Sequence, residues 1–226
     1  MTPGLRLDLH VHSNRSPDGR ASVEQLVARL AVVHLDGLAL TDHNTVAGHA
    51  SLAELSRAHP ELRLIPGVEV STLEGHLLAY GLSAPPPGGR PVAETVEWVT
   101  DQGGVPVPAH PFRRVHGVGG TVVGALRVPA LELVNGHNGP SANTRAREVA
   151  AARSLGATGG SDAHDARELG WAWTRFPEGT DSLDALLEAL RHGSTVAEGR
   201  SAGPLTRSRI ALRSLGLRLR RGLRPI

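Results

Sequence analysis

Histidine and acidic side chains recur in five short motifs spread over most of the chain. The motifs are "DLHVHS", "LTDHNT", "GVEVS", "AHPF" and "GGSDAH". In the first, His10 and His12 stand two residues apart, which on a β-strand places both imidazoles on one face. The chain has no cysteine, so any metal ion must be bound by histidine and carboxylate groups. Such ligand sets suit Zn²⁺, Mn²⁺ or Fe²⁺, and a carboxylate such as Glu69 can bridge two ions for phosphoester hydrolysis.

Strands and helices are predicted to alternate along the chain and to carry these motifs. Short apolar stretches that favour strands lie at 5–11, 36–42, 62–70, 75–81, 103–111, 129–136, 157–164, 170–176 and 194–199. Helical patterns lie at 22–34, 46–58, 91–102, 141–156 and 182–193. Ser22 is expected to cap the first helix and Gly156 to close the fourth. Roughly seven or eight β–α alternations indicate a parallel sheet or a barrel.

Each motif lies at or just past the C-terminal end of a predicted strand. In a β/α barrel these ends converge on one face, where active sites are built. Side chains that are distant in sequence can therefore meet in space. We predict an α/β fold with a TIM-like barrel and a metal cluster at the C-terminal ends of its strands.

The composition is that of a globular protein able to bury a core. The chain has 226 residues, of which 40% are hydrophobic and 20% charged. The N-terminal residues lack the apolar run of a signal peptide, and no apolar run approaches the roughly 20 residues of a membrane span. We therefore expect a cytoplasmic protein. Three tryptophans, two phenylalanines and one tyrosine offer few platforms for stacking nucleic-acid bases.

The C-terminal segment differs in composition from the rest. Residues 199–226 hold eight arginines and no acidic residue. Leucines at 212, 215, 219 and 223 form a helical stripe, which Gly216, Gly222 and Pro225 interrupt. We expect a domain over 1–200 and a basic tail over 201–226, either disordered or an amphipathic helix. The tail could contact nucleic acid or an anionic surface.

In order and in sequence, the five motifs resemble those of the PHP (polymerase and histidinol phosphatase) family, and the resemblance extends from about residue 6 to 198. It implies an irregular (β/α)7 barrel with two or three divalent ions (Zn, Mn or Fe). By position, it implies one ion held by His10, His12, Glu69 and Asp162, a second by Glu69, His76 and His110, and a third by Asp18, His43 and His164. Asp42 is expected to orient a neighbouring imidazole or a metal-bound water.

The resemblance also implies a metal-dependent phosphoesterase, in which a metal-bridging hydroxide attacks phosphorus. The residues expected to act in catalysis are Glu69, His110, Asp162 and His164. Arg113 and Arg114 follow the "AHPF" motif, and one of them is expected to bind the substrate phosphate. The substrate that the resemblance leads us to expect is a small phosphomonoester, a nucleotide or a short oligonucleotide. His116 and His137 are expected on the rim of the site.

Two other functions fit parts of the pattern. A non-catalytic, metal-stabilised scaffold or binding module would keep the barrel, although such relatives lose ligands and every expected position is filled here. A metal-dependent hydrolase of C–N bonds would also use an HxH barrel. Those enzymes usually place a carboxylated lysine at the bridge, and all 24 basic residues of this chain are arginine.

Overall fold

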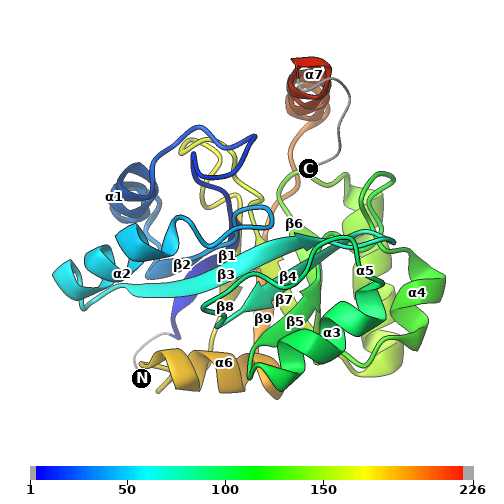
Figure 1. Ribbon diagram of the computed structural model, residues 1–226, viewed down its shortest axis with the longest axis horizontal. Coiled ribbons are helices and arrows are strands. Elements are labelled where there is room, and N and C mark those ends of the chain that lie inside the picture. Colours follow the sequence, from blue (N-terminus) through cyan, green and yellow to red (C-terminus); the bar gives the residue numbers. More distant parts are fainter. Residues whose placement is uncertain (1–3, 221–226) are drawn as a thin grey trace.

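A curled sheet of seven strands forms most of the barrel wall (Figure 1). The computed structural model describes residues 4–220. The strand order is β5-β4-β3-β2-β1-β8-β9. These strands are β1 (Arg6–Val11), β2 (Gly37–Leu40), β3 (Arg63–Ser71), β4 (His76–Tyr80), β5 (Val105–Pro108), β8 (Ala172–Arg175) and β9 (Val196–Gly199).

A second sheet of two parallel strands, β6 (Ala130–Asn135) and β7 (Gly156–Gly160), lies against β1 and β8. The Gly159 amide donates to the Thr174 hydroxyl of β8 at 2.8 Å. Just beyond β7, the Asp162 amide donates to the carbonyl of His10 in β1 at 2.8 Å. These bonds join β7 to β1 and β8, while β6 lies beside β5 at the other edge of the seven-stranded sheet. The two sheets together form an irregular TIM-like barrel, which confirms the predicted fold class.

Strand direction explains why the barrel is irregular. β1, β2 and β3 are parallel neighbours, whereas β4 runs antiparallel to β3 and to β5, and β8 runs antiparallel to β1 and to β9. Because β4 is reversed, its first residue, His76, lies at the same barrel end as the last residues of β3 and β5. The sequence pattern predicted these strands but not the reversal of β8.

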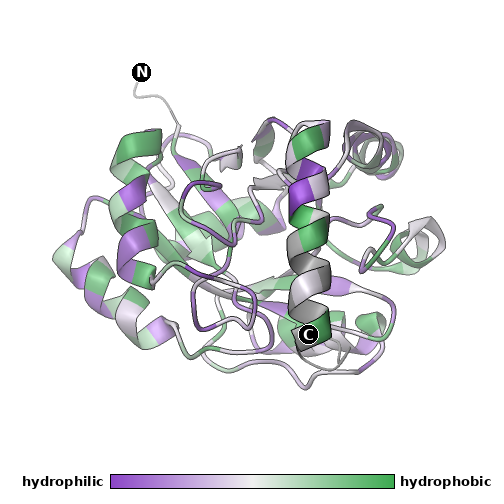
Figure 2. Ribbon diagram, turned by 90° about the horizontal axis from the view of Figure 1, so that it is seen from above, coloured by the Kyte–Doolittle hydropathy of each residue, from purple (hydrophilic) through white to green (hydrophobic). Residues whose placement is uncertain are grey.

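The helices pack outside the wall and at its two ends. They are α1 (Val23–Val33), α2 (His49–Ala58), α3 (Val92–Asp101), α4 (Gly120–Ala125), α5 (Pro140–Arg153), α6 (Leu183–Arg191) and α7 (Pro204–Arg220). Ser22 caps α1 in a capping box with Gln25, as predicted. The predicted end of α5 was wrong: Ser154 ends it in the left-handed conformation, and Gly156 begins β7. Figure 2 looks onto the end of the barrel that α7 crosses.

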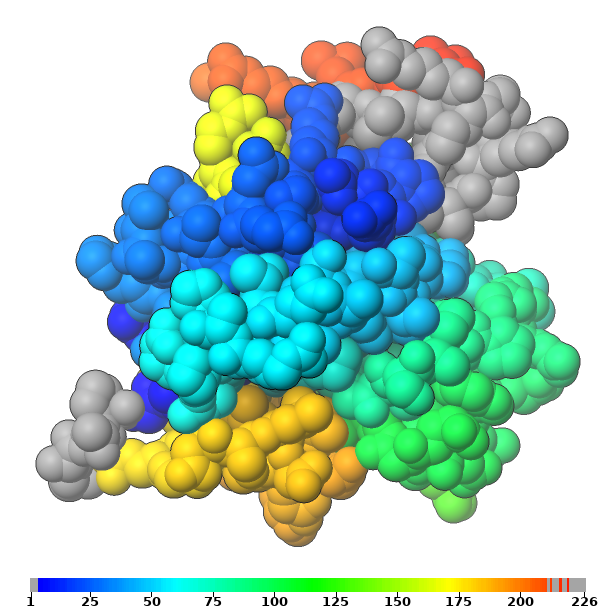
Figure 3. Space-filling view, turned by 60° about the vertical axis from the view of Figure 1, so that its left-hand side comes forward, coloured from blue at the N-terminus to red at the C-terminus, as the bar shows by residue number. Residues whose placement is uncertain are grey.

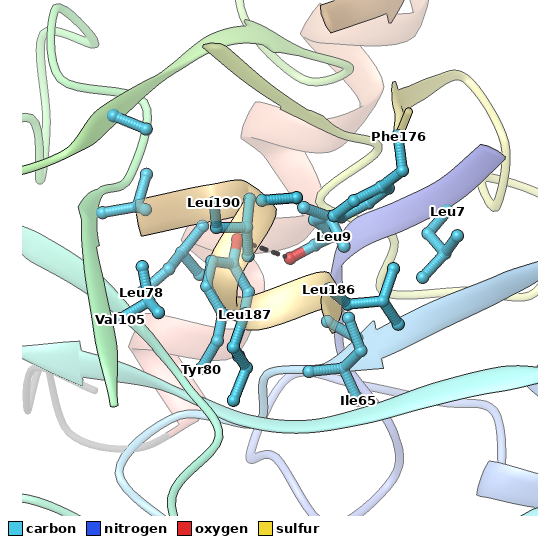
Figure 4. Close-up of a cluster of buried hydrophobic side chains, with 14 of the residues drawn as sticks. Leu7, Leu9, Ile65, Leu78, Tyr80, Val105, Phe176, Leu186, Leu187 and Leu190 are labelled. Carbon is cyan, nitrogen blue, oxygen red and sulfur yellow. Dashed lines mark hydrogen bonds between the residues drawn. The ribbon is translucent and has the colours of Figure 1, made fainter. Parts of the chain in front are cut away.

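Apolar side chains fill the barrel below the strand ends. Tyr80, Leu9 and Phe176 pack with Leu187 and Leu190 of α6, which covers the end of the barrel opposite α7 (Figures 1 and 4). The Tyr80 hydroxyl donates to the Leu9 carbonyl at 3.0 Å, which satisfies its polar group in this core. The polar residues at the strand ends therefore lie next to a packed apolar core. None of the helices in residues 4–220 is long and apolar enough to cross a membrane.

Candidate metal centre

All nine predicted ligand residues meet at the C-terminal end of the barrel. They are His10, His12, Asp18, His43, Glu69, His76, His110, Asp162 and His164. All except Asp18 and His164 are buried, and the buried ones lie at or just beyond the ends of strands. Two of them adopt left-handed backbone conformations, His110 with φ 31° and Asp162 with φ 59°. Such strain in residues other than glycine is typical of functional sites.

The first predicted ligand group has the spacing of atoms arranged around a small cation. His10 Nε2 lies 3.2 Å from Glu69 Oε2 and 3.5 Å from Asp162 Oδ1. His12 Nε2 lies 3.2 and 3.4 Å from the same two oxygens. Ligands bound at about 2.0–2.1 Å around a tetrahedral ion lie about 3.3–3.4 Å apart.

Both of these nitrogens are buried, and neither has a hydrogen-bond partner among the described residues. A buried imidazole nitrogen without a partner is costly in a folded protein. A divalent ion at this point would satisfy both nitrogens and both carboxylates. The residues present therefore fit the metal that the motifs predict.

Glu69 presents its two oxygens to two sets of imidazoles. Oε2 faces His10, His12 and His43, the last at 3.3 Å from Nδ1. Oε1 lies 2.8 Å from His76 Nδ1 and 2.9 Å from His110 Nε2. One carboxylate thus links the first and second predicted groups, as a bridging ligand would. His43, assigned by its motif only to the third group, also lies next to the second.

The third predicted group also comes together. Asp18 Oδ2 lies 3.0 Å from His164 Nε2 and 3.4 Å from His43 Nε2. His164 Nδ1 lies 2.7 Å from the Asp162 carbonyl, so a proton on Nδ1 leaves the Nε2 lone pair facing the group. His12 completes a set of four side chains here.

Burial and neighbouring charges shift the pKa values of Glu69 and His12 in opposite directions. Burial alone would raise the pKa of Glu69, but His43, His10 and His76 lower it well below its usual range. Burial alone would lower the pKa of His12, but the carboxylates of Asp162 and Glu69 raise it to about 10. In the metal-free protein the carboxylates are therefore ionised and His12 carries a proton.

Two acidic residues that sequence reasoning missed contact the predicted ligands on the side away from the centre. Glu132 Oε1 lies 2.9 Å from His10 Nδ1, and Glu132 Oε2 accepts from the His110 amide at 2.6 Å. Asp8 accepts from the amides of Ser161 and His10 at 2.8 and 3.3 Å. The signal for both was an acidic residue inside an otherwise apolar strand.

Burial raises the pKa of Asp8 to about 6, although the hydrogen bonds that it accepts act in the opposite direction. A carboxylate behind a ligating imidazole fixes the ring orientation and increases the basicity of the nitrogen that binds metal. For His10 this carboxylate is Glu132.

Arg113 is bonded to the centre rather than directed only at solvent. Its Nη2 donates to Asp162 Oδ2 and to Asn135 Oδ1, each at 2.6 Å, and its Nε donates to Asn138 at 2.9 Å. Its side chain is 27% exposed. Arg113 therefore orients Asp162, while Arg114 is exposed on the same loop.

Among the described residues, Asp42 forms its side-chain hydrogen bonds with Ser13 rather than with a neighbouring imidazole. Its two oxygens accept from the Ser13 amide and the Ser13 hydroxyl, each at 2.7 Å. Asp42 thus fixes the backbone that follows His12. The two histidines expected on the rim lie beside ligands: the His116 ring stacks on His76, and His137 is buried beside His164.

An irregular β/α barrel with a histidine–carboxylate cluster at its strand ends defines a class of metal-centre folds. The family model for the PHP domain matches residues 8–103, and the model for the PHP-associated segment matches residues 140–195. The chain therefore belongs to the PHP family.

Two relatives in sequence match parts of the chain. The uncharacterized protein MJ1587 of Methanocaldococcus jannaschii is 28% identical over 144 residues, which cover 59% of this chain and 84% of that protein. The 5′-3′ exoribonuclease Rnm of Salmonella typhimurium is 40% identical over 88 residues, or 37% of this chain. That match spans only 30% of the exoribonuclease.

Solved structures share the fold at low sequence identity. PsfC from Pseudomonas syringae has a TM-score of 0.71 at 18% identity, over 96% of this chain and 99% of PsfC. A candidate metal-dependent phosphoesterase from Bifidobacterium adolescentis has a TM-score of 0.58 at 20% identity, over 70% of this chain and 87% of that one. Endonuclease Q, in complex with a 27-mer duplex carrying an abasic lesion, has a TM-score of 0.66 at 16% identity. The match covers 83% of this chain and 56% of Endonuclease Q.

Proposed function

We propose that this protein is a metal-dependent phosphoesterase that holds two or three divalent ions. The observation that carries the proposal is the pair of buried Nε2 atoms of His10 and His12. Both face Glu69 Oε2 and Asp162 Oδ1 at 3.2–3.5 Å without hydrogen bonds. When bound, divalent ions would supply Lewis acidity toward a phosphoryl oxygen and lower the pKa of a water molecule.

The side chains have distinct roles in this proposal. Glu69 divides its two oxygens between two ion positions, while Asp162 presents one oxygen to His10 and His12 and gives the other to Arg113. The Arg113 guanidinium keeps Asp162 ionised and oriented, because its positive charge helps to lower the pKa of that carboxyl below its usual range against burial. Arg114 remains the candidate for binding the substrate phosphate.

The substrate class in this proposal is a small phosphomonoester, a nucleotide or a short oligonucleotide. The name of the Salmonella relative, a 5′-3′ exoribonuclease, and the duplex bound to Endonuclease Q support a nucleotide or a short oligonucleotide as the substrate. The proposed catalytic residues are Glu69, His110, Asp162 and His164. In this proposal Glu69 would take the bridging position, and the chain has no lysine, which disfavours the C–N hydrolases that use a carboxylated lysine.

Hydrolysis of p-nitrophenyl phosphate with Mn²⁺ tests the proposal. The wild-type protein should release phosphate, and His10→Ala and Glu69→Gln should each lose activity, because each removes an atom that faces the same ion position. His59→Ala is the matched control, since His59 ends α2 at the opposite end of the barrel and is exposed. Equal turnover in all four proteins would contradict the proposal.

A substrate panel then separates the substrate classes. Histidinol phosphate, 3′- and 5′-nucleotides, 3′,5′-bisphosphates and short oligonucleotides should be compared by kcat/KM under one set of metal conditions. Metal bound stoichiometrically, with no turnover of any substrate, would instead favour the non-catalytic scaffold.

A further inference from the structure

A cleft of about 640 Å³ lies between α7 and the loop that follows β7. Its walls include Arg20, Trp171, Arg209 and Ile210. This volume is in the range of pockets that bind small organic ligands, about 300–1,000 Å³. In Figure 3 the loop after β1, the loop after β7 and the start of α7 meet at one end of the molecule.

The cleft adjoins the metal centre through direct contacts. The Arg20 amide donates to the His164 carbonyl at 3.0 Å, so the loop bearing Arg20 is attached to a proposed ligand. The Trp171 ring lies 5.9 Å from the His137 ring, which in turn stacks on His164 at 5.4 Å. A substrate group that extends from the centre toward α7 would therefore reach Trp171.

The segment that leads into α7 is fixed across the mouth of the barrel. The Arg200 amide donates to the Trp171 carbonyl at 2.8 Å, and the Ala202 amide donates to the Gly136 carbonyl at 2.7 Å. Asn143 also donates to the Ser201 hydroxyl at 3.0 Å. These bonds position the first turns of α7, and with them Arg209, beside the centre.

The acidic side chains of the cleft are already paired within the protein. Asp165 binds Arg167 through both carboxylate oxygens, at 2.9 and 3.0 Å. Glu168 accepts from the His164 amide at 2.9 Å and lies 3.2 Å from His137. Arg20 and Arg209 are exposed, and neither makes a hydrogen bond or an ion pair with a described side chain, although the Arg20 charge acts on the nearby Asp165.

We propose that this cleft binds a nucleotide of a single-stranded nucleic acid next to the phosphoester in the metal centre, with a base on Trp171 and a phosphate on Arg20 and Arg209. The inference rests on the proposed phosphoesterase function and narrows its substrate to short single strands. Aromatic rings combined with arginines are the elements of such sites, because every base has a face that can stack.

Binding is measured without turnover by fluorescence anisotropy of labelled pentanucleotides, RNA and DNA, in EDTA. Trp171→Ala should weaken binding about tenfold or more, and Trp171→Phe should restore most of it. Arg209→Ala should also weaken binding. Arg127→Ala is the matched control, because Arg127 is exposed just before β6, at the opposite barrel end.

The salt dependence of binding separates the two roles. Arg209→Ala and Arg20→Ala should each lower the slope of log K against log salt by about 0.7, because each removes one phosphate contact. Trp171→Ala should lower affinity with the slope unchanged. Circular dichroism melts of all variants identify any loss of folding, and Arg209→Ala keeps the proposal testable if Trp171→Ala unfolds.

The two proposals fail in different ways. If the wild type hydrolyses p-nitrophenyl phosphate but does not bind pentanucleotides, the cleft proposal is wrong and the phosphoesterase proposal stands. If it binds pentanucleotides through Trp171 and Arg209 but hydrolyses nothing, the cleft proposal stands and the phosphoesterase proposal is wrong. Binding that Trp171→Ala and Arg209→Ala leave unchanged, or binding of phosphatidylserine vesicles in place of pentanucleotides, would overturn the cleft proposal.

Discussion

His10 is contacted on both nitrogens of its ring. Nε2 faces the oxygens of Glu69 and Asp162, and Nδ1 lies 2.9 Å from Glu132. A ring held in this way presents one nitrogen to the centre at a fixed angle. The same carboxylate also accepts from the backbone amide of His110, so Glu132 supports two predicted ligands from β6, a strand that contributes none of them.

Glu132→Gln should weaken metal binding without abolishing it. Changes to residues behind the ligands typically cost about 10–100-fold in metal affinity or activity, whereas loss of a ligand costs more. Metal affinity measured by competition with a chelator should therefore rank wild type, then Glu132→Gln, then His10→Ala. An affinity of Glu132→Gln equal to that of the wild type would show that Glu132 has no such role.

Metal binding at neutral pH should release protons. Burial lowers the pKa of His12, but Asp162 and Glu69 outweigh it and raise that pKa to about 10, so His12 is protonated at pH 7 in the metal-free protein. A ligating imidazole must lose this proton. Affinity should therefore increase with pH through the neutral range. Calorimetric titrations in buffers of different ionisation enthalpy measure the protons released, and identical heats in all buffers would refute the expectation.

Most of the proposed ligands could be predicted from sequence because they sit in short motifs at strand ends, whereas Asp18 and His76 lie outside the five motifs. The residues behind them could not, because their roles depend on partners far along the chain. Glu132 acts on His10 from 122 residues away, and Arg113 acts on Asp162 from 49 residues away. Arginine after "AHPF" suggested a phosphate site, and only the fold shows that Arg113 is bonded to a carboxylate.

At the scale of elements, the close approach of β7 to β1 depends on glycine. A Cβ on Gly160 would lie 2.4 Å from the His10 Cβ and 2.6 Å from the His10 amide nitrogen. A Cβ on Gly159 would lie 2.5 Å from the Trp173 carbonyl oxygen of β8. The two glycines of the "GGSDAH" motif are therefore explained by strand packing around the predicted ligands.

Gly160→Ala should destabilise the protein and should also disturb the first predicted ligand group, which contains His10. Overpacking of this kind costs about 1–3 kcal/mol, which corresponds to several degrees in Tm. Gly124→Ala is the matched control, because a Cβ there meets nothing within 4 Å and alanine is favoured in α4 by roughly 0.5 kcal/mol. Thermal melts and metal titrations compare the two, and equal Tm values would contradict the packing argument.

The element pattern was predictable where periodicity and capping residues were clear, as in α1 with Ser22 and Gln25. It was not predictable where tertiary pairing decides direction. β8 pairs antiparallel with both β1 and β9, and nothing in the "GWAWTRF" stretch distinguishes that from a parallel strand. The end of α5 was misplaced because Ser154, rather than a glycine, adopts the left-handed conformation.

For the whole molecule, the centre gathers buried histidines and carboxylates, and the Nε2 atoms of His10 and His12 have no hydrogen-bond partner among the described residues. A ligand that binds only the folded state stabilises it, by about 2.7 kcal/mol at a concentration of 100 Kd. Mn²⁺ or Zn²⁺ should therefore raise the Tm of the EDTA-treated protein by several degrees. His10→Ala should reduce this shift and His59→Ala should not. A Tm that is unaffected by metal would count against a metal centre.

The most direct test of the central claim is anomalous diffraction at a metal absorption edge from crystals grown with Mn²⁺ or Zn²⁺. The account predicts a peak about 2.0–2.3 Å from His10 Nε2, His12 Nε2 and an oxygen of Glu69, with a second peak on the other side of Glu69. Density in which these nitrogens contact only protein or water, with no anomalous peak in the cluster, would contradict it.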